Sequence, residues 1–194
     1  GQGATYNVTG SRTLVGNSEN TFTYELNEGT KAGNYNITTH NGTLTVTNRD
    51  AKYEITVEAK SLTDKYDGTE KSVDGFETLE FEVNSQKYTV SGLTAEAKGT
   101  DAGTYPVNVT GTAVVKDAKG NDVTSQFAVE TENGSLVINK RKVTLTSATD
   151  EKEYDGTALT NDTVKVDGDG FANGEGATYN VTGSQTLVGD SENF

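Results

Sequence analysis

The stretch Gly3–Asn20 (GATYNVTGSRTLVGNSEN) returns almost unchanged as Gly176–Asn193 (GATYNVTGSQTLVGDSEN). The two copies differ at only two positions and lie 173 residues apart. Self-similarity at a fixed spacing is the mark of a repeat array. The chain is therefore a series of repeats, and each local motif has to be interpreted within its repeat.

Two landmarks show that this spacing contains two units. Tyr66–Thr69 (YDGT) recurs 88 positions later as Tyr154–Thr157. Asn41–Val46 (NGTLTV) has its counterpart 92 positions later in Asn133–Ile138 (NGSLVI). The repeat is therefore about 90 residues long, which is enough to fold on one core without a metal or a disulfide.

A third landmark, Ala-Gly-x-Tyr, occurs at 32–35 and at 102–105, only 70 positions apart. We interpret this shorter spacing as a difference in internal loop length between units. In this register 1–49 is the C-terminal half of one repeat, 50–140 is a complete repeat, and 141–194 is the N-terminal half of the next. The chain is thus cut out of register with its repeat, and joining 141–175 to 3–49 would rebuild a complete unit.

The pattern of apolar residues predicts an all-β chain. Hydrophobic residues make up only 31% of the sequence, but they fall in short runs with period two, such as Tyr53, Ile55 and Val57, which is typical of strands with one buried face. Each repeat is expected to be a small β-sandwich (Ig-like) or a β-grasp-like domain. The only proline, Pro106, should lie on a sheet edge because it cannot donate a ladder hydrogen bond.

One hairpin is predicted from turn chemistry. The segment 117–122 (DAKGND) carries Gly and Asn, which accept positive φ. We expect it to connect a strand at 113–115 to a paired strand at 127–129.

The charge excludes some classes of partner. The net charge is −13, which disfavours nucleic acid and anionic membrane surfaces, because both need lysine and arginine side chains against phosphate. The sequence has no cysteine, so disulfides and thiolate metal sites are excluded. No apolar run approaches the roughly 20 residues that span a bilayer, and the sequence begins without a signal peptide.

The ordered motifs together carry a family resemblance. They are an opening strand K-V-T-L-T (142–146), the Y-D-G-T element, the strand G-A-T-Y-N-V-T-G, the A-G-x-Y turn, and the closing N-G-T-L-T-V or N-G-S-L-V-I. This set resembles the MBG-type tandem repeats of large cell-surface adhesins of Gram-positive Firmicutes. The resemblance implies an extracellular, cell-wall-attached β protein whose repeats form a stalk. It implies no catalytic residues and no demonstrated ligand.

Two Tyr-Asp-Gly elements are the most site-like motifs, because an aromatic ring, a carboxylate and a glycine adjoin. The structural interpretation is preferred: the tyrosine packs at the end of a strand and Asp-Gly forms the following turn. The residues that define the repeat structurally are Tyr66, Asp67, Gly68, Tyr154, Asp155 and Gly156, with Gly42 and Gly134 before the closing strands.

Calcium is the one cofactor that the sequence leaves open. Asp162, Asp167, Asp169 and Glu175 form an acidic cluster, and calcium takes six to eight oxygen ligands. Against a site, Gly168 and Gly170 mark an ordinary loop, and the register of an EF-hand loop is absent. The expectation is therefore no cofactor, with these four residues as weak calcium candidates.

The sequence does not predict an enzyme. His40 is the only histidine, so the complete repeat has none for a serine or threonine triad. A Lys–Asn isopeptide bond would need residues such as Lys142 and Asn139, which lie where repeats meet and are more simply explained as solvated linkers.

Two functions remain. The first is a structural stalk in which repeats joined at 48–50 and 139–141 project a binding region from the cell wall. The alternative is that the repeats themselves bind host glycans, mucin or matrix protein multivalently, with calcium assisting. The expected partners are neighbouring repeats of the same chain and a second copy, in which 141–194 of one molecule completes 1–49 of another, since incomplete repeats leave strand edges unpaired.

Overall fold

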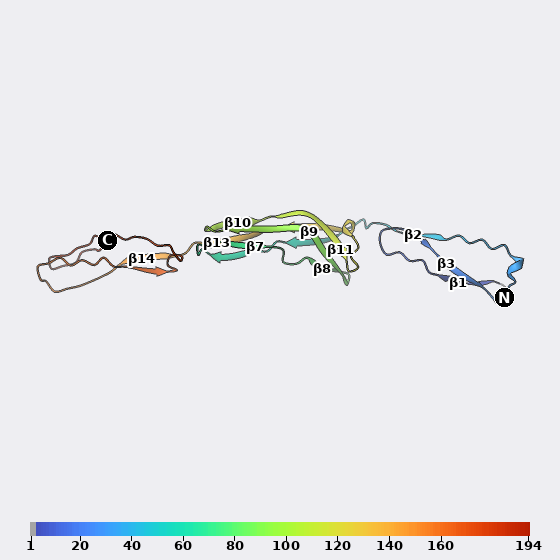
Figure 1. The fold of residues 1–194 in the computed structure, drawn as a ribbon, viewed down its shortest axis with the longest axis horizontal. Coiled ribbons are helices and arrows are strands. Elements are labelled where there is room, and N and C mark those ends of the chain that lie inside the picture. Colours follow the sequence, from blue (N-terminus) through green and yellow to red (C-terminus); the bar gives the residue numbers. More distant parts are fainter. Residues whose placement is uncertain (1–2) are drawn as a thin grey trace. The chain divides into compact units, whose positions relative to one another are not determined.

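The computed structural model describes residues 3–194 and shows an all-β chain (Figure 1). The three segments predicted from the sequence are called here the N-terminal segment (1–49), the middle segment (50–140) and the C-terminal segment (141–194). The N-terminal segment contains β1 (Ala4–Val8), β2 (Gly16–Asn20), β3 (Phe22–Leu26), the 3-10 helix η1 (Ala32–Asn34) and β4 (Gly42–Val46). The C-terminal segment contains β14 (Val143–Ser147) and β15 (Val164–Gly168).

The middle segment holds the remaining elements. They are β5 (Tyr53–Glu58), β6 (Leu62–Lys65), β7 (Lys71–Asp74), β8 (Glu80–Val83), β9 (Gln86–Gly99), β10 (Gly103–Val107), β11 (Val109–Asp117), the 3-10 helix η2 (Thr124–Gln126), β12 (Phe127–Glu132) and β13 (Gly134–Asn139).

The strands form several small sheets, as expected for a sandwich-like domain. In the middle segment the sheet orders are β10-β13-β6 and β11-β9-β7, with β8 also paired to β9 and β12 paired to β5. The N-terminal segment has the antiparallel pairs β1-β3 and β2-β4, and the C-terminal segment has β14-β15. Across residues 3–194, every strand pairing stays within one of the three segments.

The chain divides into two compact units. One consists of Gly1–Thr56, Leu79–Gly92 and Ala113–Glu130, and the other of Val57–Thr78, Leu93–Thr112 and Thr131–Phe194. In the second unit a core cluster contains Ala59, Val73, Ala95, Val107, Leu136 and Ile138. In the first unit the Phe127 ring packs between Tyr53 and Tyr88, with centroid distances of 5.5 and 4.8 Å.

The prediction for Pro106 is confirmed, and the hairpin prediction is partly wrong. Pro106 lies in β10, which is an edge strand of its sheet. The turn at 117–122 forms, closed by the Asp117 N–H to the Asn121 carbonyl at 3.0 Å. The strand that follows, β12, pairs with β5 and not with β11. The 3-10 helix η2 lies between the turn and β12, and β5, with its buried Ile55 and Val57, supplies the partner strand.

The structure corrects the third sequence landmark. Ala32–Asn34 forms η1, and its counterpart is η2 at 124–126, which lies 92 positions later, the same spacing as for β4 and β13. The strand β10, which begins at Gly103, corresponds instead to β2, which begins at Gly16. Both strands pair antiparallel with the closing strand in one register, Gly16 opposite Val46 and Gly103 opposite Ile138. The Ala-Gly-x-Tyr identity at a spacing of 70 is therefore a coincidence of composition.

With this register, equivalent positions differ sharply in burial. Phe127 is 4% exposed, whereas the equivalent Tyr35 is 49% exposed. Val57 is fully buried, whereas the equivalent Leu145 is 48% exposed. Among residues 3–194 every buried apolar residue except Ala172 belongs to the middle segment. The complete repeat thus forms a core that the two flanking segments do not.

Candidate functional site at the repeat junction

The two Asp-Gly turns have the same geometry. Asp67 Oδ1 accepts hydrogen bonds from the backbone N–H and the hydroxyl of Thr69, at 2.9 and 2.6 Å. Asp155 Oδ1 accepts the same pair from Thr157, at 2.9 and 2.8 Å. Gly68 and Gly156 both have φ near +81°, a conformation that favours glycine. The motif makes the turn that the sequence predicts.

A lysine binds each of these aspartates, but from a different place in the sequence. Lys71 Nζ donates to Asp67 Oδ2 at 2.6 Å, and Lys152 Nζ donates to Asp155 Oδ1 at 2.9 Å. These hydrogen bonds, followed by those from the threonines, hold the pKa of both carboxyls below its usual range. Both motifs therefore have a lysine–aspartate pair. Lys71 follows its motif in the sequence, whereas Lys152 precedes its own.

Gly134 and Gly42, the glycines before the closing strands, meet different surroundings. A Cβ on Gly134 would lie 2.2 Å from the Lys60 carbonyl oxygen, so the strand can approach the backbone there only without a side chain. A Cβ on Gly42 would have its nearest neighbour, Asn20 Cβ, at 3.7 Å. The glycine is sterically required only where the repeat is complete.

Arg141 lies at the junction of the middle and C-terminal segments and contacts the backbone of both. Its Nε donates to the Gly170 carbonyl at 2.7 Å, and a terminal nitrogen donates to the Tyr66 carbonyl at 3.3 Å. The other terminal nitrogen donates to the Asp169 carbonyl. One guanidinium thus connects the loop after β15 to the end of β6, and its rigid fork of donors suits this role.

Two side-chain pairs reinforce this junction. Lys65 Nζ contacts Asp169 Oδ1 at 2.5 Å, and the Tyr66 hydroxyl donates to the Glu175 carboxylate. Asp169 Oδ2 also accepts the Lys142 backbone N–H at 2.8 Å. That backbone bond, followed by Lys65, lowers the pKa of Asp169, whereas the bond to Glu175 raises the pKa of Tyr66. A shallow hollow of about 270 Å³ lies beside these residues.

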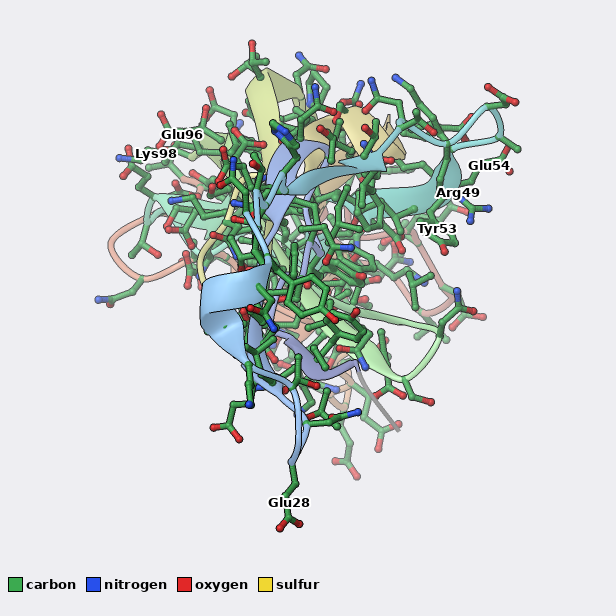
Figure 2. All side chains as sticks on the ribbon, turned by 90° about the vertical axis from the view of Figure 1, so that its right-hand side faces the viewer. Glu28, Arg49, Tyr53, Glu54, Glu96 and Lys98 are labelled. Atoms are coloured by element: carbon green, nitrogen blue, oxygen red, sulfur yellow. The ribbon has the colours of Figure 1, made fainter. Side chains whose placement is uncertain are left out.

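The other junction uses the equivalent arginine differently. Arg49 lies 92 positions before Arg141, and its guanidinium stacks on the Tyr53 ring at 4.1 Å (Figure 2). Its backbone N–H donates to Gln126 Oε1 at 3.1 Å, and Gln126 Nε2 donates to Asn48 Oδ1 at 2.6 Å. Both junctions predicted at 48–50 and 139–141 therefore hold specific contacts.

Three of the four calcium candidates bind a lysine or a tyrosine of the chain, and the fourth is exposed. Asp167 pairs with Lys165 at 2.9 Å, Asp169 contacts Lys65, Glu175 accepts from Tyr66, and Asp162 is exposed. Within residues 3–194, no three acidic or histidine side chains are grouped so that they could hold a metal ion. His40 is exposed and precedes β4.

Sequence reasoning predicted junctions at 48–50 and 139–141 but did not name most of the residues that contact one another there. Lys65, Tyr66 and Arg141 come together with Asp169 and Glu175 only through the tertiary fold, since up to 109 residues separate the partners. The available signal was the arginine shared by Asn48-Arg49 and Lys140-Arg141 at the repeat spacing.

Comparisons with family models, with curated proteins and with solved structures find no match for this chain. No helix within residues 3–194 is long and apolar enough to cross a membrane.

Proposed function

We propose that this chain is part of the stalk of a bacterial cell-surface adhesin, in which head-to-tail repeats of the MBG type project a binding region from the cell wall. The function is mechanical, and no residue is assigned a catalytic role. A repeat of about 90 residues adds on the order of 30 Å of reach. The proposal places the protein outside the cell, attached to the wall of a Gram-positive bacterium.

The observation that carries this proposal is the junction built on Arg141. A spacer has to resist bending between its repeats, and flexible linkers without contacts across them cannot do so. Arg141, the Lys65–Asp169 pair and the Tyr66–Glu175 hydrogen bond connect consecutive segments through side chains as well as through the chain itself. Their role in a stalk is to limit the angle between repeats.

The competing function is direct binding of host glycans, mucin or matrix protein by the repeats. It is favoured by an apolar groove of about 460 Å³ in the N-terminal segment, lined by Tyr6, Tyr24 and Tyr35. Aromatic faces of this kind can stack on sugar rings. However, the position of Tyr35 is occupied in the complete repeat by Phe127, which is buried. A complete repeat would therefore not present this groove in the same form, which favours the stalk.

The stalk proposal is tested by bending and by binding. Residual dipolar couplings of the amides in β14 and β15 are expected to share one alignment with those of β13 in the wild-type chain. Arg141→Ala should scale down the couplings of β14 and β15 and leave β13 unchanged. Lys165→Ala is the matched control, because Lys165 pairs with Asp167 of the same strand, β15, and not with the middle segment as far as residues 3–194 show.

The binding arm presents the 194-residue chain to mucin and to a glycan array, with calcium and with chelator. The stalk proposal expects no saturable signal in either condition. Saturable binding would support the glycan-binding alternative, and its loss on chelation would return the four acidic residues to the mechanism.

A further inference from the structure

The sequence contains three Asn-Gly dipeptides, at 41–42, 133–134 and 173–174. Asparagine is chemically labile, and a following glycine makes it more so, because no side chain shields the glycine nitrogen from the neighbouring side-chain amide. The reaction between the two groups needs a side chain and a backbone that can move. The structure therefore decides which of the three asparagines reacts.

Asn133 is held on both sides of its amide group. Its Oδ1 accepts the Val109 N–H at 2.8 Å, and its Nδ2 donates to Asn108 Oδ1 at 3.2 Å. The glycine that follows, Gly134, begins the central strand β13. Both partners of the reaction are thus fixed in the complete repeat.

Asn41 is held less firmly. Its Nδ2 donates to Glu19 Oε2 at 3.2 Å, and both side chains are exposed. Gly42 is the first residue of β4 and lies opposite Asn20 in the ladder with β2. One side-chain hydrogen bond and one strand end therefore restrain this dipeptide.

Asn173 is free to react. It is exposed, and its side chain makes no hydrogen bond within residues 3–194. Asn173 and Gly174 are the central residues of a tight turn, closed by the Glu175 N–H to the Ala172 carbonyl at 3.0 Å. Gly174 has φ of +83°, and no atom lies within 4 Å of the place that a Cβ would take. The turn thus sets an unhindered glycine nitrogen beside an unbound amide.

The two ends of this turn are fixed. Ala172 is 5% exposed and is the one buried apolar residue of the C-terminal segment. Glu175 accepts the Tyr66 hydroxyl, and its Oε1 lies 3.8 Å from the place of a Cβ on Gly68, so it rests against the YDGT turn. A longer main chain between 172 and 175 therefore has to displace one of these ends.

We propose that Asn173 is a site of spontaneous deamidation, and that the isoaspartate formed there releases Glu175 from Tyr66 and loosens the junction. The ligand of the site is water, which the reaction consumes. Both the reaction and the junction contacts belong to this chain, so neither depends on the stalk function.

The reaction needs no oxidant or enzyme. The Gly174 nitrogen loses its proton to hydroxide and attacks Asn173 Cγ. The bond from Cγ to Nδ2 breaks, and ammonia leaves with a proton from water, which restores the hydroxide and leaves a succinimide ring. Water then opens the ring. Opening at Cγ gives aspartate, whereas opening at the Asn173 backbone carbonyl gives isoaspartate, in which the main chain runs through Cβ and Cγ.

The isoaspartate changes the turn in two ways. It adds one carbon to the main chain between Ala172 and Glu175, and it adds a carboxylate two residues before Glu175. Repulsion between exposed carboxylates is weak because solvent and salt screen it. The longer main chain is therefore the larger effect, and the ordinary aspartate product should leave the junction closed.

The first experiment measures the reaction. The 194-residue chain is incubated at mildly alkaline pH, and mass spectrometry of its peptides follows conversion of each asparagine. We expect Asn173 to convert at least roughly tenfold faster than Asn133, whose two hydrogen bonds must break before it can react. Asn41 should convert at a rate between the two. Equal rates at Asn173 and Asn133 would overturn the proposal.

The second experiment measures the junction in the incubated chain. Hydrogen exchange at the Lys142 and Asp169 amides should rise as isoaspartate accumulates, by roughly two- to fivefold at full conversion, because an exposed polar pair is lost. Asn173→Gln, whose longer side chain cannot form the five-membered ring, should keep its exchange unchanged through the same incubation. A fresh Asn173→Asp chain, which carries the charge without the added carbon, should exchange as wild type.

Two results would contradict the link to the junction. One is isoaspartate at position 173 with unchanged exchange at the Lys142 and Asp169 amides. The other is exchange that rises equally in the incubated Asn173→Gln chain. A fresh Asn173→Asp chain that already exchanges as fast as the incubated wild type would overturn the proposed main-chain mechanism.

Discussion

The Tyr66 hydroxyl donates a hydrogen bond to the Glu175 carboxylate, joining the complete repeat to the segment that follows it. Tyr66 is partly buried against the core of its repeat. Its counterpart Tyr154 in the C-terminal segment is 64% exposed. Of the two YDGT tyrosines, Tyr66 is thus the one that contributes to a junction.

Removing this hydroxyl should loosen the junction without unfolding the repeat. Tyr66→Phe is expected to raise hydrogen exchange at the Lys142 and Asp169 amides by roughly two- to fivefold, because an exposed polar pair contributes modestly. Tyr154→Phe, which lacks this partner, should leave those amides unchanged. Identical exchange in wild type and Tyr66→Phe would show that the bond contributes nothing to the junction.

Arg141→Ala should have a larger effect than Arg49→Ala. Arg141 donates to three backbone carbonyls, whereas the Arg49 side chain donates to one and stacks on Tyr53. Losing hydrogen bonds from a charged group costs about 1–3 kcal/mol. In Arg141→Ala this loss should lower the free energy needed to open the junction. The rate of protease cleavage within 139–143 measures how often this junction opens. Equal cleavage rates in the two variants would contradict the proposed role of Arg141 at the junction.

Gly134→Ala should destabilise the complete repeat strongly. The added Cβ would collide with the Lys60 and Ala59 carbonyls, at 2.2 and 2.8 Å, and backbone cannot move aside as a flexible side chain can. We expect a loss of about 2 kcal/mol or more, lowering the melting temperature by roughly 10 °C for a domain of this size. Gly42→Ala, at the equivalent position, is the control and should change the melting temperature by less than about 2 °C.

Leu136→Ala and Leu44→Ala compare the complete and incomplete cores. Leu136 is fully buried, so its truncation is expected to cost about 2–5 kcal/mol. Leu44 is half-buried and should cost about 1 kcal/mol or less. Denaturant unfolding followed by circular dichroism measures both. A similar cost at both positions would mean that the N-terminal segment has a core of its own.

Acid should weaken the fold through the aspartates of the turns. Bonds from Lys71 and Lys152 lower the pKa of Asp67 and Asp155 in the folded chain. A depressed folded pKa contributes stability that is present above the unfolded pKa of about 3.9 and is lost as pH falls through the folded value. The melting temperature should therefore stay level near neutral pH and fall below about pH 4.

The lysines allow this titration to be assigned. Lys71→Ala should raise the pKa of Asp67 and leave that of Asp155 in place, and Lys152→Ala should do the reverse, as read by carbon NMR of the carboxyls. A change at both aspartates in either variant would show that the shifts have another origin.

The turns and the closing strands could be predicted from the sequence because their determinants are local. Asp67 and Asp155 form the same hydrogen bonds to threonines two residues later, and each glycine that follows takes a positive φ. Pro106 falls on an edge because a residue without N–H cannot pair on both sides. The partner of β12 was predicted wrongly, because the pairing of two strands depends on which apolar faces meet and not on the turn between them.

The sequence by itself determined the repeat and the short-range hydrogen bonds that form in each copy of it. Arg12 and Gln185, which differ between the two copies, still donate to the carbonyls of Leu14 and Leu187, at 2.7 and 2.8 Å. Only the tertiary structure decided which copy forms strands. The identical pentapeptide Ala-Thr-Tyr-Asn-Val is the strand β1 at 4–8 but not a strand at 177–181. A strand exists only through hydrogen bonds to a neighbour, and β1 has β3 beside it, whereas 177–181 has no paired strand among the described residues.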